Sequence, residues 1–234
     1  MPYVPAPVIE KLCFIEGFLL IMKKNIKIHG SLKSANFRKV VAVARYLGIE
    51  YSHASNDVYK GEGQTESYLS INKLGQIPTL VVDNDIITES NAIIIYLSEY
   101  SRTNELYASN PSSQTAINQW LFWESSQWQP VLSKVMGTHV GHKLLPSVLP
   151  APTSPVDWDS PDCMKQMSYL ESSLKNDWLT GANISLADFS IAAMTTYFKV
   201  CEFPFHAYPN INRWYGSMND LQSWKSTESQ TWSC

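Results

Sequence analysis

The chain of 234 residues has a formal net charge of −3, with 44% apolar and 17% charged residues. This length allows one large domain or two small ones, and the composition is that of a folded globular protein, not a disordered one. Because no run of five or more basic residues occurs, the sequence argues against a nucleic-acid partner.

The cysteines and histidines form no recognisable metal or redox motif. We therefore expect no metal site. Scattered thiols without a recognisable secretion signal are typical of a reducing cytosol, so a cytoplasmic location is expected. The four thiols are Cys13, Cys163, Cys201 and Cys234.

Residues 1–21 are interpreted as an N-terminal extension outside the fold. The apolar stretch Leu12–Met22 contains Glu16 and is too short to span a bilayer, so no membrane association is expected. Lys23 and Lys24 follow it where a signal peptide would have small residues. The alternative is a short helix docked on the domain surface.

The hydrophobic pattern of residues 26–100 predicts the order β-α-β followed by β-β-α. Between the two halves of this pattern, residues 58–74 are polar and are predicted to form a loop with one helical stretch near 66–70. This order is the thioredoxin-like plan. Strands are expected at 26–29, 50–55, 78–82 and 85–88, and helices at 34–47 and from about 89.

Beyond a polar linker at 101–111, the period is helical almost throughout. Pro130 is expected to kink the first long helix, and the five prolines of 145–161 predict a loop. An all-helical second domain is therefore predicted. Its expected helices are 113–136, 163–174, 185–200 and 210–217.

The segment Gln76-Ile77-Pro78 precedes a predicted strand. If the Ile77–Pro78 bond is cis, the chain turns sharply and leaves the backbone N–H and C=O of Ile77 free to pair with a peptide-like ligand. Considered alone, Pro78 is equally well an ordinary proline at the start of a strand.

Glu89 and Ser90 stand at the start of a predicted helix. A helix N-terminus attracts a carboxylate, the Ser90 hydroxyl adds a donor, and Glu89 can hold an ammonium group. Together these groups match the α-amino acid end of a γ-glutamyl unit. The simpler alternative is that Ser90 only caps the helix.

In combination, these motifs resemble the glutathione transferase superfamily. The segments SANFRKVVAVARYLGIEY, INKLGQIPTLV and ITESNAIIIYL follow in the family's order, and GANISLAD, with its capping box of Ser185 and Asp188, resembles a late family motif. The resemblance covers about residues 24–217. It implies a thioredoxin-like α/β domain at 22–101 and an all-α domain at 112–234.

The family's pattern assigns a glutathione contact to each matching position. Ile77, beside cis-Pro78, would pair with the cysteinyl backbone, and Glu89 and Ser90 would hold the γ-glutamyl end. Gln76 and Gln64 would approach the glycyl carboxylate. Related classes have a basic residue or histidine near Gln64, so glycyl recognition is weaker here or is taken over by Lys60.

Ser34 resembles the catalytic serine of the serine-type (bacterial, phi or theta-like) classes. Its hydroxyl would donate to the glutathione sulfur and lower the thiol pKa, helped by the positive end of the helix. Ser31 and Asn36 are rival donors, and capping alone is the structural alternative. No cysteine occurs in 30–37, which argues against the cysteine-type relatives.

The resemblance implies a glutathione transferase that conjugates the thiolate to small, mostly apolar electrophiles in detoxification. Trp120, Trp123 and Met136 are candidates for the second-substrate pocket, although the tryptophans could equally fill the core. Glutathione would be a co-substrate, no other cofactor is expected, and a homodimer is implied. The alternatives are a non-catalytic glutathione-binding module and a glutathione-dependent reductase or dehalogenase.

Overall fold

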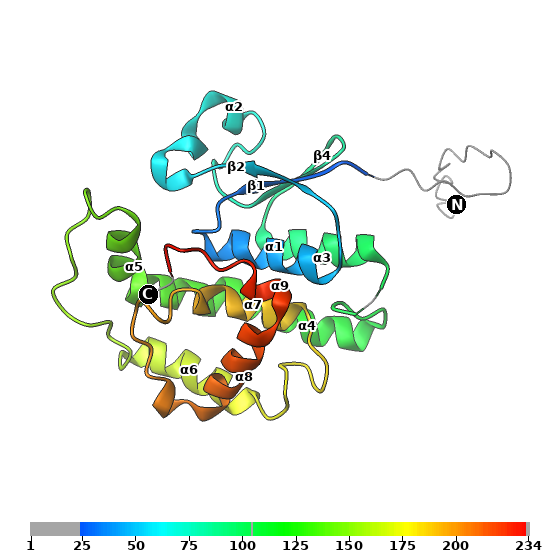
Figure 1. Cartoon of the computed structure of the whole chain (residues 1–234). Coiled ribbons are helices and arrows are strands. Elements are labelled where there is room, and N and C mark those ends of the chain that lie inside the picture. Colours follow the sequence, from blue (N-terminus) through cyan, green and yellow to red (C-terminus); the bar gives the residue numbers. More distant parts are fainter. Residues whose placement is uncertain (1–23, 104, 233–234) are drawn as a thin grey trace, which may run out of the picture.

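The computed structural model describes residues 24–103 and 105–232. The predicted extension at 1–21 lies outside the described residues. Figure 1 shows a small sheet and its helices above a larger group of helices. This arrangement confirms the predicted fold class, a thioredoxin-like α/β half followed by an all-helical half.

The sheet has four strands in the order β2-β1-β3-β4. β1 pairs with β2 in parallel, and both β1–β3 and β3–β4 are antiparallel. The predicted alternation therefore gave the correct strand order along the chain. The strands are β1 (Ile26–Gly30), β2 (Ser52–Ser55), β3 (Thr79–Val82) and β4 (Asp85–Ile87).

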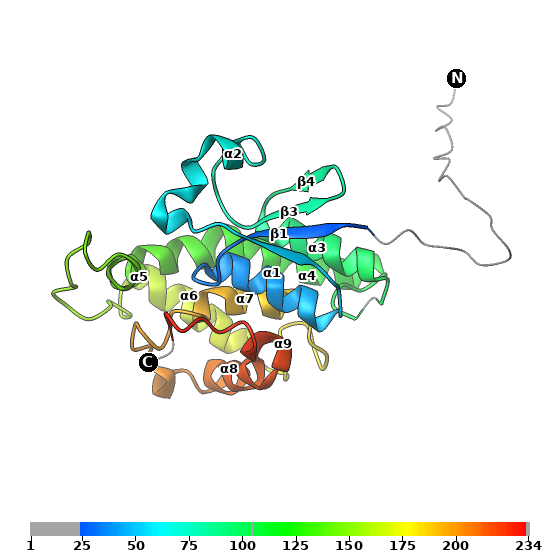
Figure 2. The ribbon, with the colours of Figure 1, turned by 45° about the horizontal axis from the view of Figure 1, so that its top comes forward.

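Helices α1 and α3 lie together on one face of the sheet, between it and the helical half (Figures 1 and 2). The segment between β2 and β3 forms short turns on the other side. The elements are α1 (Ala35–Tyr46), the 3-10 turns η1 (Val58–Lys60) and η2 (Glu62–Gln64), α2 (Glu66–Leu69) and α3 (Ser90–Ser101).

In the helical half, α7 is buried over its whole length and packs against both α1 and α4. Its N-terminus has the predicted capping box, because the Asp188 carboxylate accepts from the Ser185 amide at 2.9 Å. The elements are α4 (Pro111–Trp123), α5 (Gln129–Leu144), α6 (Pro161–Ser173), α7 (Leu186–Thr195), η4 (Phe205–Ala207), α8 (Pro209–Asp220) and α9 (Gln222–Lys225).

The disturbance expected from Pro130 takes the form of a π-helical segment, η3 (Glu124–Trp128), between α4 and α5. A proline inside a helix removes one N–H donor and crowds the preceding turn, and a widened turn relieves both effects. The hydroxyls of Ser125 and Ser126 donate to the carbonyl of Phe122, at 3.2 and 2.7 Å. The chain therefore continues in helical form to Leu144.

One continuous apolar core joins the sheet, α1, α3 and the helical half. Trp128, Trp214 and Trp224 are fully buried in it, as the simpler interpretation of the aromatic residues predicts. Across residues 24–103 and 105–232, no helix has the length and apolar character needed to cross a membrane.

Candidate functional site

The predicted site residues meet at one end of the sheet. Register pairs Gly30 with Ser55, His29 with Thr79, and Leu80 with Ile87. The turn after β1, the Ile77–Pro78 dipeptide before β3 and the Glu89–Ser90 pair after β4 therefore leave the sheet at the same end.

Two helix N-termini converge at this end. Both β1 and β4 run antiparallel to β3, so α1 and α3, which follow them, begin on the same side of the molecule. Each N-terminus presents unpaired amides and a partial positive charge. The end of the sheet between them therefore favours an anionic ligand.

Glu89 has a backbone conformation that non-glycine residues rarely adopt, with φ 66° and ψ 112°. Such a conformation is unfavourable by of order 1–3 kcal/mol and persists where the surroundings impose it. Its side chain is exposed, whereas Ser90 is buried at the first position of α3. Glu89 is thus held toward solvent beside the start of a helix.

The Ile77–Pro78 peptide bond is cis. Just before it, the carbonyl of Gln76 accepts hydrogen bonds from the Tyr68 hydroxyl at 2.7 Å and the Asn72 amide at 2.9 Å. Both donors are buried and both also bond Thr79 at the start of β3. The backbone on either side of Ile77 is therefore fixed, while Ile77 lies outside the strand ladder.

Gln64 lies beside the loop that carries Gln76. A Cβ on Gly75 would sit 2.5 Å from the Gln64 amide nitrogen, and one on Gly63 would sit 2.2 Å from the Gly75 carbonyl oxygen. The two loops touch through glycine backbones because no side chain fits between them. Both Gln64 and Gln76 are exposed at this junction.

Ser34 caps α1, with its hydroxyl oxygen 3.4 Å from the Phe37 amide. A hydroxyl has one proton and two acceptor positions, so capping leaves the proton free to donate. Among the described residues, no group accepts that proton. The rival Asn36 is engaged, because its amide donates to Gln129 at 3.3 Å, whereas Ser31 accepts weakly from the Lys33 amide at 3.4 Å.

A pocket of about 320 Å³ opens beside Ser34, between the start of α1 and the helical half. Met136 lines it, as do Tyr59 and Tyr197. Trp120 and Trp123 do not line this pocket. They pack against Tyr169 of α6, with ring centroids 5.4 and 5.1 Å apart.

A larger hollow of about 640 Å³ lies across α5 from this pocket, between that helix and residues 152–162. His139 lines it, but Ser34 does not. We assign the site to the smaller pocket because Ser34 and the N-terminus of α1 line it. No group of three or more metal-binding side chains occurs in the part of the chain that the structure describes.

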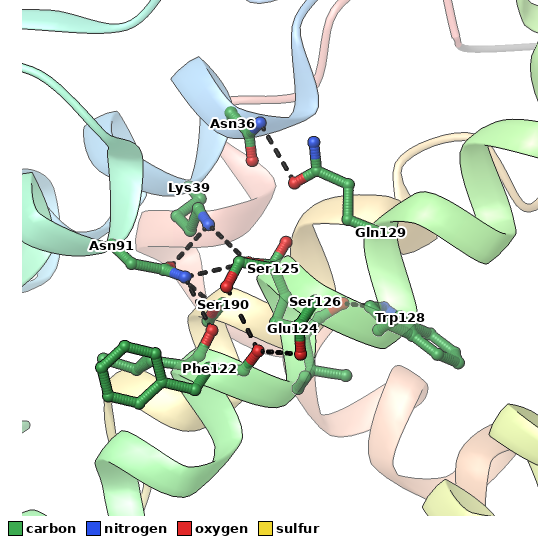
Figure 3. Close-up of polar contacts among 12 residues, drawn as sticks. Asn36, Lys39, Asn91, Phe122, Glu124, Ser125, Ser126, Trp128, Gln129 and Ser190 are labelled. Carbon is green, nitrogen blue, oxygen red and sulfur yellow. Dashed lines mark hydrogen bonds and ion pairs between the residues drawn. The ribbon is translucent and has the colours of Figure 1, made fainter.

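A buried polar network lies behind the site, between α1, α3 and η3 (Figure 3). Lys39 donates to the Asn91 side-chain oxygen at 2.8 Å and lies 3.5 Å from the Glu124 carboxylate. Asn91 in turn donates to Glu124 at 2.9 Å and accepts from Ser190 at 2.8 Å. Burial lowers the pKa of Lys39, and the charge of Glu124 opposes that shift.

Several residues of the site were missed by the sequence analysis. Lys39 reads as an exposed position on an amphipathic helix, and its partner Glu124 is remote in sequence. Tyr68 lies in the helical stretch predicted near 66–70, which the structure has as α2, and Asn72 lies in the predicted loop after it; neither was predicted to support the site. Tyr197 follows the capped helix α7 and carried no separate signal.

Both halves of the chain match one protein family. Residues 26–99 match the family model "Glutathione S-transferase, N-terminal domain", and residues 142–221 match "Glutathione S-transferase, C-terminal domain". Glutathione S-transferase D6 of Drosophila melanogaster is 27% identical over 183 residues, which are 78% of this chain and 81% of the relative.

Solved structures share the fold. Glutathione transferase F2 from Populus trichocarpa has a TM-score of 0.77 at 22% identity, over 86% of this chain and 96% of its own. A glutathione S-transferase-I bound with lactoylglutathione also has a TM-score of 0.77, at 21% identity, over 87% and 98% of the two chains.

Proposed function

Since the chain belongs to the glutathione S-transferase family, we propose that it conjugates the glutathione thiolate to small, mostly apolar electrophiles, with Ser34 as the residue that activates the thiol. The observation that carries this proposal is Ser34 itself. It caps α1, retains an uncommitted hydroxyl proton and lines the pocket of about 320 Å³.

Glutathione would bind across the end of the sheet. Ile77 would pair its backbone with the cysteinyl unit, and Glu89 and Ser90 would hold the ammonium and carboxylate of the γ-glutamyl unit. Gln64 and Gln76 would approach the glycyl carboxylate. The structural neighbour bound with lactoylglutathione supports the proposal, since that ligand is glutathione with an acyl group on its sulfur, a thioester.

In the reaction, the Ser34 hydroxyl would donate a hydrogen bond to sulfur, which stabilises the thiolate over the thiol. The thiol proton leaves to solvent. With chlorodinitrobenzene, the sulfur forms a bond to the ring carbon and chloride departs. The protein supplies orientation through the two helix N-termini and the pocket.

The test is conjugation of glutathione to chlorodinitrobenzene by the purified protein and by Ser34→Ala. We expect kcat to fall roughly 100-fold, as on removal of one transition-state donor, with KM for glutathione nearly unchanged. Asn110→Ala is the matched control, because Asn110 caps α4 at 2.9 Å and is remote from the site. It should lose similar stability and keep its activity.

Two results would overturn parts of the proposal. Unchanged kcat in Ser34→Ala, with a loss in Ser31→Ala or Asn36→Ala, would move the activating role to a rival donor. Retention of the protein on glutathione resin without any conjugation would favour the non-catalytic module. Disulfide reduction or dehalogenation by the wild-type protein would point to the remaining alternative.

We further propose a cytoplasmic homodimer that acts in detoxification. Besides the family resemblance, large apolar side chains on the surface support self-association. Phe122 on α4 is 73% exposed and Leu74 is 64% exposed. Light scattering after size exclusion should give twice the chain mass, and a monomer would refute the assignment.

A further inference from the structure

The turn that carries Ser34 is held from the helical half. Within the turn, the Ser34 amide donates to the Ser31 carbonyl at 2.9 Å, and the Lys33 side chain pairs with Asp57 at 2.9 Å. Two further polar groups of the turn are the Lys33 carbonyl and the Ala35 amide. Their partners come from residues beyond α7.

The Tyr197 hydroxyl bonds both groups at once. It accepts from the Ala35 amide at 3.0 Å and donates to the Lys33 carbonyl at 3.2 Å. It therefore bridges the residues immediately before and after Ser34. Burial raises the pKa of Tyr197 above its usual range, so the phenol stays protonated and able to donate.

Trp232 is the second partner. Its indole nitrogen donates to the same Lys33 carbonyl at 3.2 Å, and its ring packs edge-on against Tyr197 with centroids 4.8 Å apart. Its side chain is 2% exposed. Lys33 thus receives two donors from different parts of the helical half.

The segment that carries Trp232 runs along α1 from its C-terminal end to its start, as the red trace after α9 in Figures 1 and 2 shows. Arg45 donates to the Ser226 carbonyl at 2.6 Å, and Arg38 donates to the Thr227 hydroxyl at 3.1 Å. Residues 226–232 therefore form a strap that is anchored along α1 before it reaches the turn.

We propose that Tyr197 and Trp232 are positioning residues that hold the Lys33–Ala35 turn, so that the Ser34 hydroxyl faces the pocket. The inference rests on the proposed function, because it assigns Ser34 the activating role. It adds that the thiol-activating group of the first half is placed by two side chains of the second. The Ala35 amide, being taken by Tyr197, is not available to the sulfur.

The experiment uses Tyr197→Phe and Trp232→Phe, which remove one donor each and keep an aromatic ring. Tyr107→Phe and Trp158→Phe are matched controls. The Tyr107 hydroxyl bonds Asn118 at 3.0 Å, and the Trp158 indole donates to the Cys201 carbonyl at 3.0 Å. For each variant we would measure kcat, KM for glutathione and the pKa of the bound thiol from its ultraviolet thiolate absorbance.

We expect Tyr197→Phe to lower kcat roughly tenfold and to raise the pKa of the bound thiol by about half a unit or more, since small misplacements weaken catalytic contacts steeply. Trp232→Phe leaves the Tyr197 hydroxyl bonded to the Lys33 carbonyl, so its kcat should fall only about threefold. The double variant should exceed the product of the two effects because the donors share one acceptor. The kcat of the two control variants should stay within about twofold of the wild-type value.

If Tyr197→Phe and the double variant melt earlier but keep kcat and the bound-thiol pKa, the contacts are only structural and the inference is wrong. Should Tyr197→Phe fail to fold, Trp232→Phe carries the same test. If the wild-type protein does not bind glutathione, the proposed function fails by itself. The hold of Tyr197 on the Lys33–Ala35 turn is then tested by amide hydrogen exchange at Ala35, which should become faster in Tyr197→Phe. Unchanged exchange would refute the positioning role of Tyr197.

Discussion

The Lys39–Glu124 pair offers a sharp test of what joins the two halves of the molecule. Both side chains are at most 1% exposed and lie 3.5 Å apart. Glu124→Gln keeps the shape and leaves the Lys39 ammonium buried with Asn91 as its partner. Removing one member of a buried ion pair is destabilising by about 3–5 kcal/mol, a large part of a typical stability of about 5–15 kcal/mol.

The pH dependence of this loss follows from the pKa of Lys39. Burial lowers this pKa, and the negative charge of Glu124 raises it. Without Glu124 the folded-state pKa falls further below the unfolded value of 10.5. The destabilisation by the buried Lys39 ammonium is therefore fully present below the pKa of Lys39 in the folded variant. It shrinks as the pH rises from there toward the pKa of the unfolded chain. Urea unfolding at about pH 7 and about pH 9.5 should show the gap between variant and wild type narrowing.

The matched control is the exposed pair of Arg213 and Asp177, 3.7 Å apart. Asp177→Asn should change stability by less than about 1 kcal/mol, as exposed pairs do. The double variant Lys39→Met/Glu124→Leu, which removes both charges, should recover most of the loss. If Glu124→Gln and the wild type unfold at the same urea concentration at pH 7, the pair is not a buried charge interaction and the reasoning is refuted.

Three further predictions concern the rest of the site and the core. Gly63→Ala should weaken glutathione binding in calorimetry, because the added Cβ would lie 2.2 Å from the Gly75 carbonyl oxygen; Gly216→Ala, with nothing within 4 Å, should not. Burial, with the charges of Lys27 and His53, lowers the pKa of His29 below 6.5. The unfolded chain then takes up the proton first as pH falls, so stability should drop below about pH 6.5, and His29→Gln should flatten that slope in urea titrations. Burial raises the pKa of Cys163 to about 11 and that of Cys201 to about 12, so maleimide should label neither in the native protein at neutral pH, as peptide mass spectrometry would show.

Much of the fold could be predicted from the sequence because its signals are local. Alternation located the strands, and the capping box of Ser185 and Asp188 located the start of α7. The site motifs are equally local, since Ile77–Pro78 and Glu89–Ser90 are joined by one hairpin. Their assignment to glutathione contacts stays a prediction, as do the domain boundaries.

What could not be predicted depends on contacts between distant segments. The apolar period of α1 identifies the face toward the sheet, yet Asn91 of α3 and Glu124 of η3 surround Lys39, so it is buried where a one-sided helix would expose it. The strap at 226–232 has no periodic signature. Its course is set by side chains of α1, above all Arg38, whose guanidinium also lies 4.1 Å from the Trp224 ring.

If the proposal is right, Tyr197, Trp232 and Ser34 together decide where a thiolate is stabilised. A helix start offers a sulfur both its first amide and its cap side chain, but here Tyr197 occupies the Ala35 amide at 3.0 Å. In the proposed function, stabilisation of the thiolate therefore rests on the Ser34 hydroxyl. If Tyr197 acts through Ser34, then Tyr197→Phe should lose its effect on kcat once Ser34→Ala is in place, because no hydroxyl remains to be positioned. Independent, multiplicative effects in the double variant would instead give Tyr197 a contact of its own with the reacting groups.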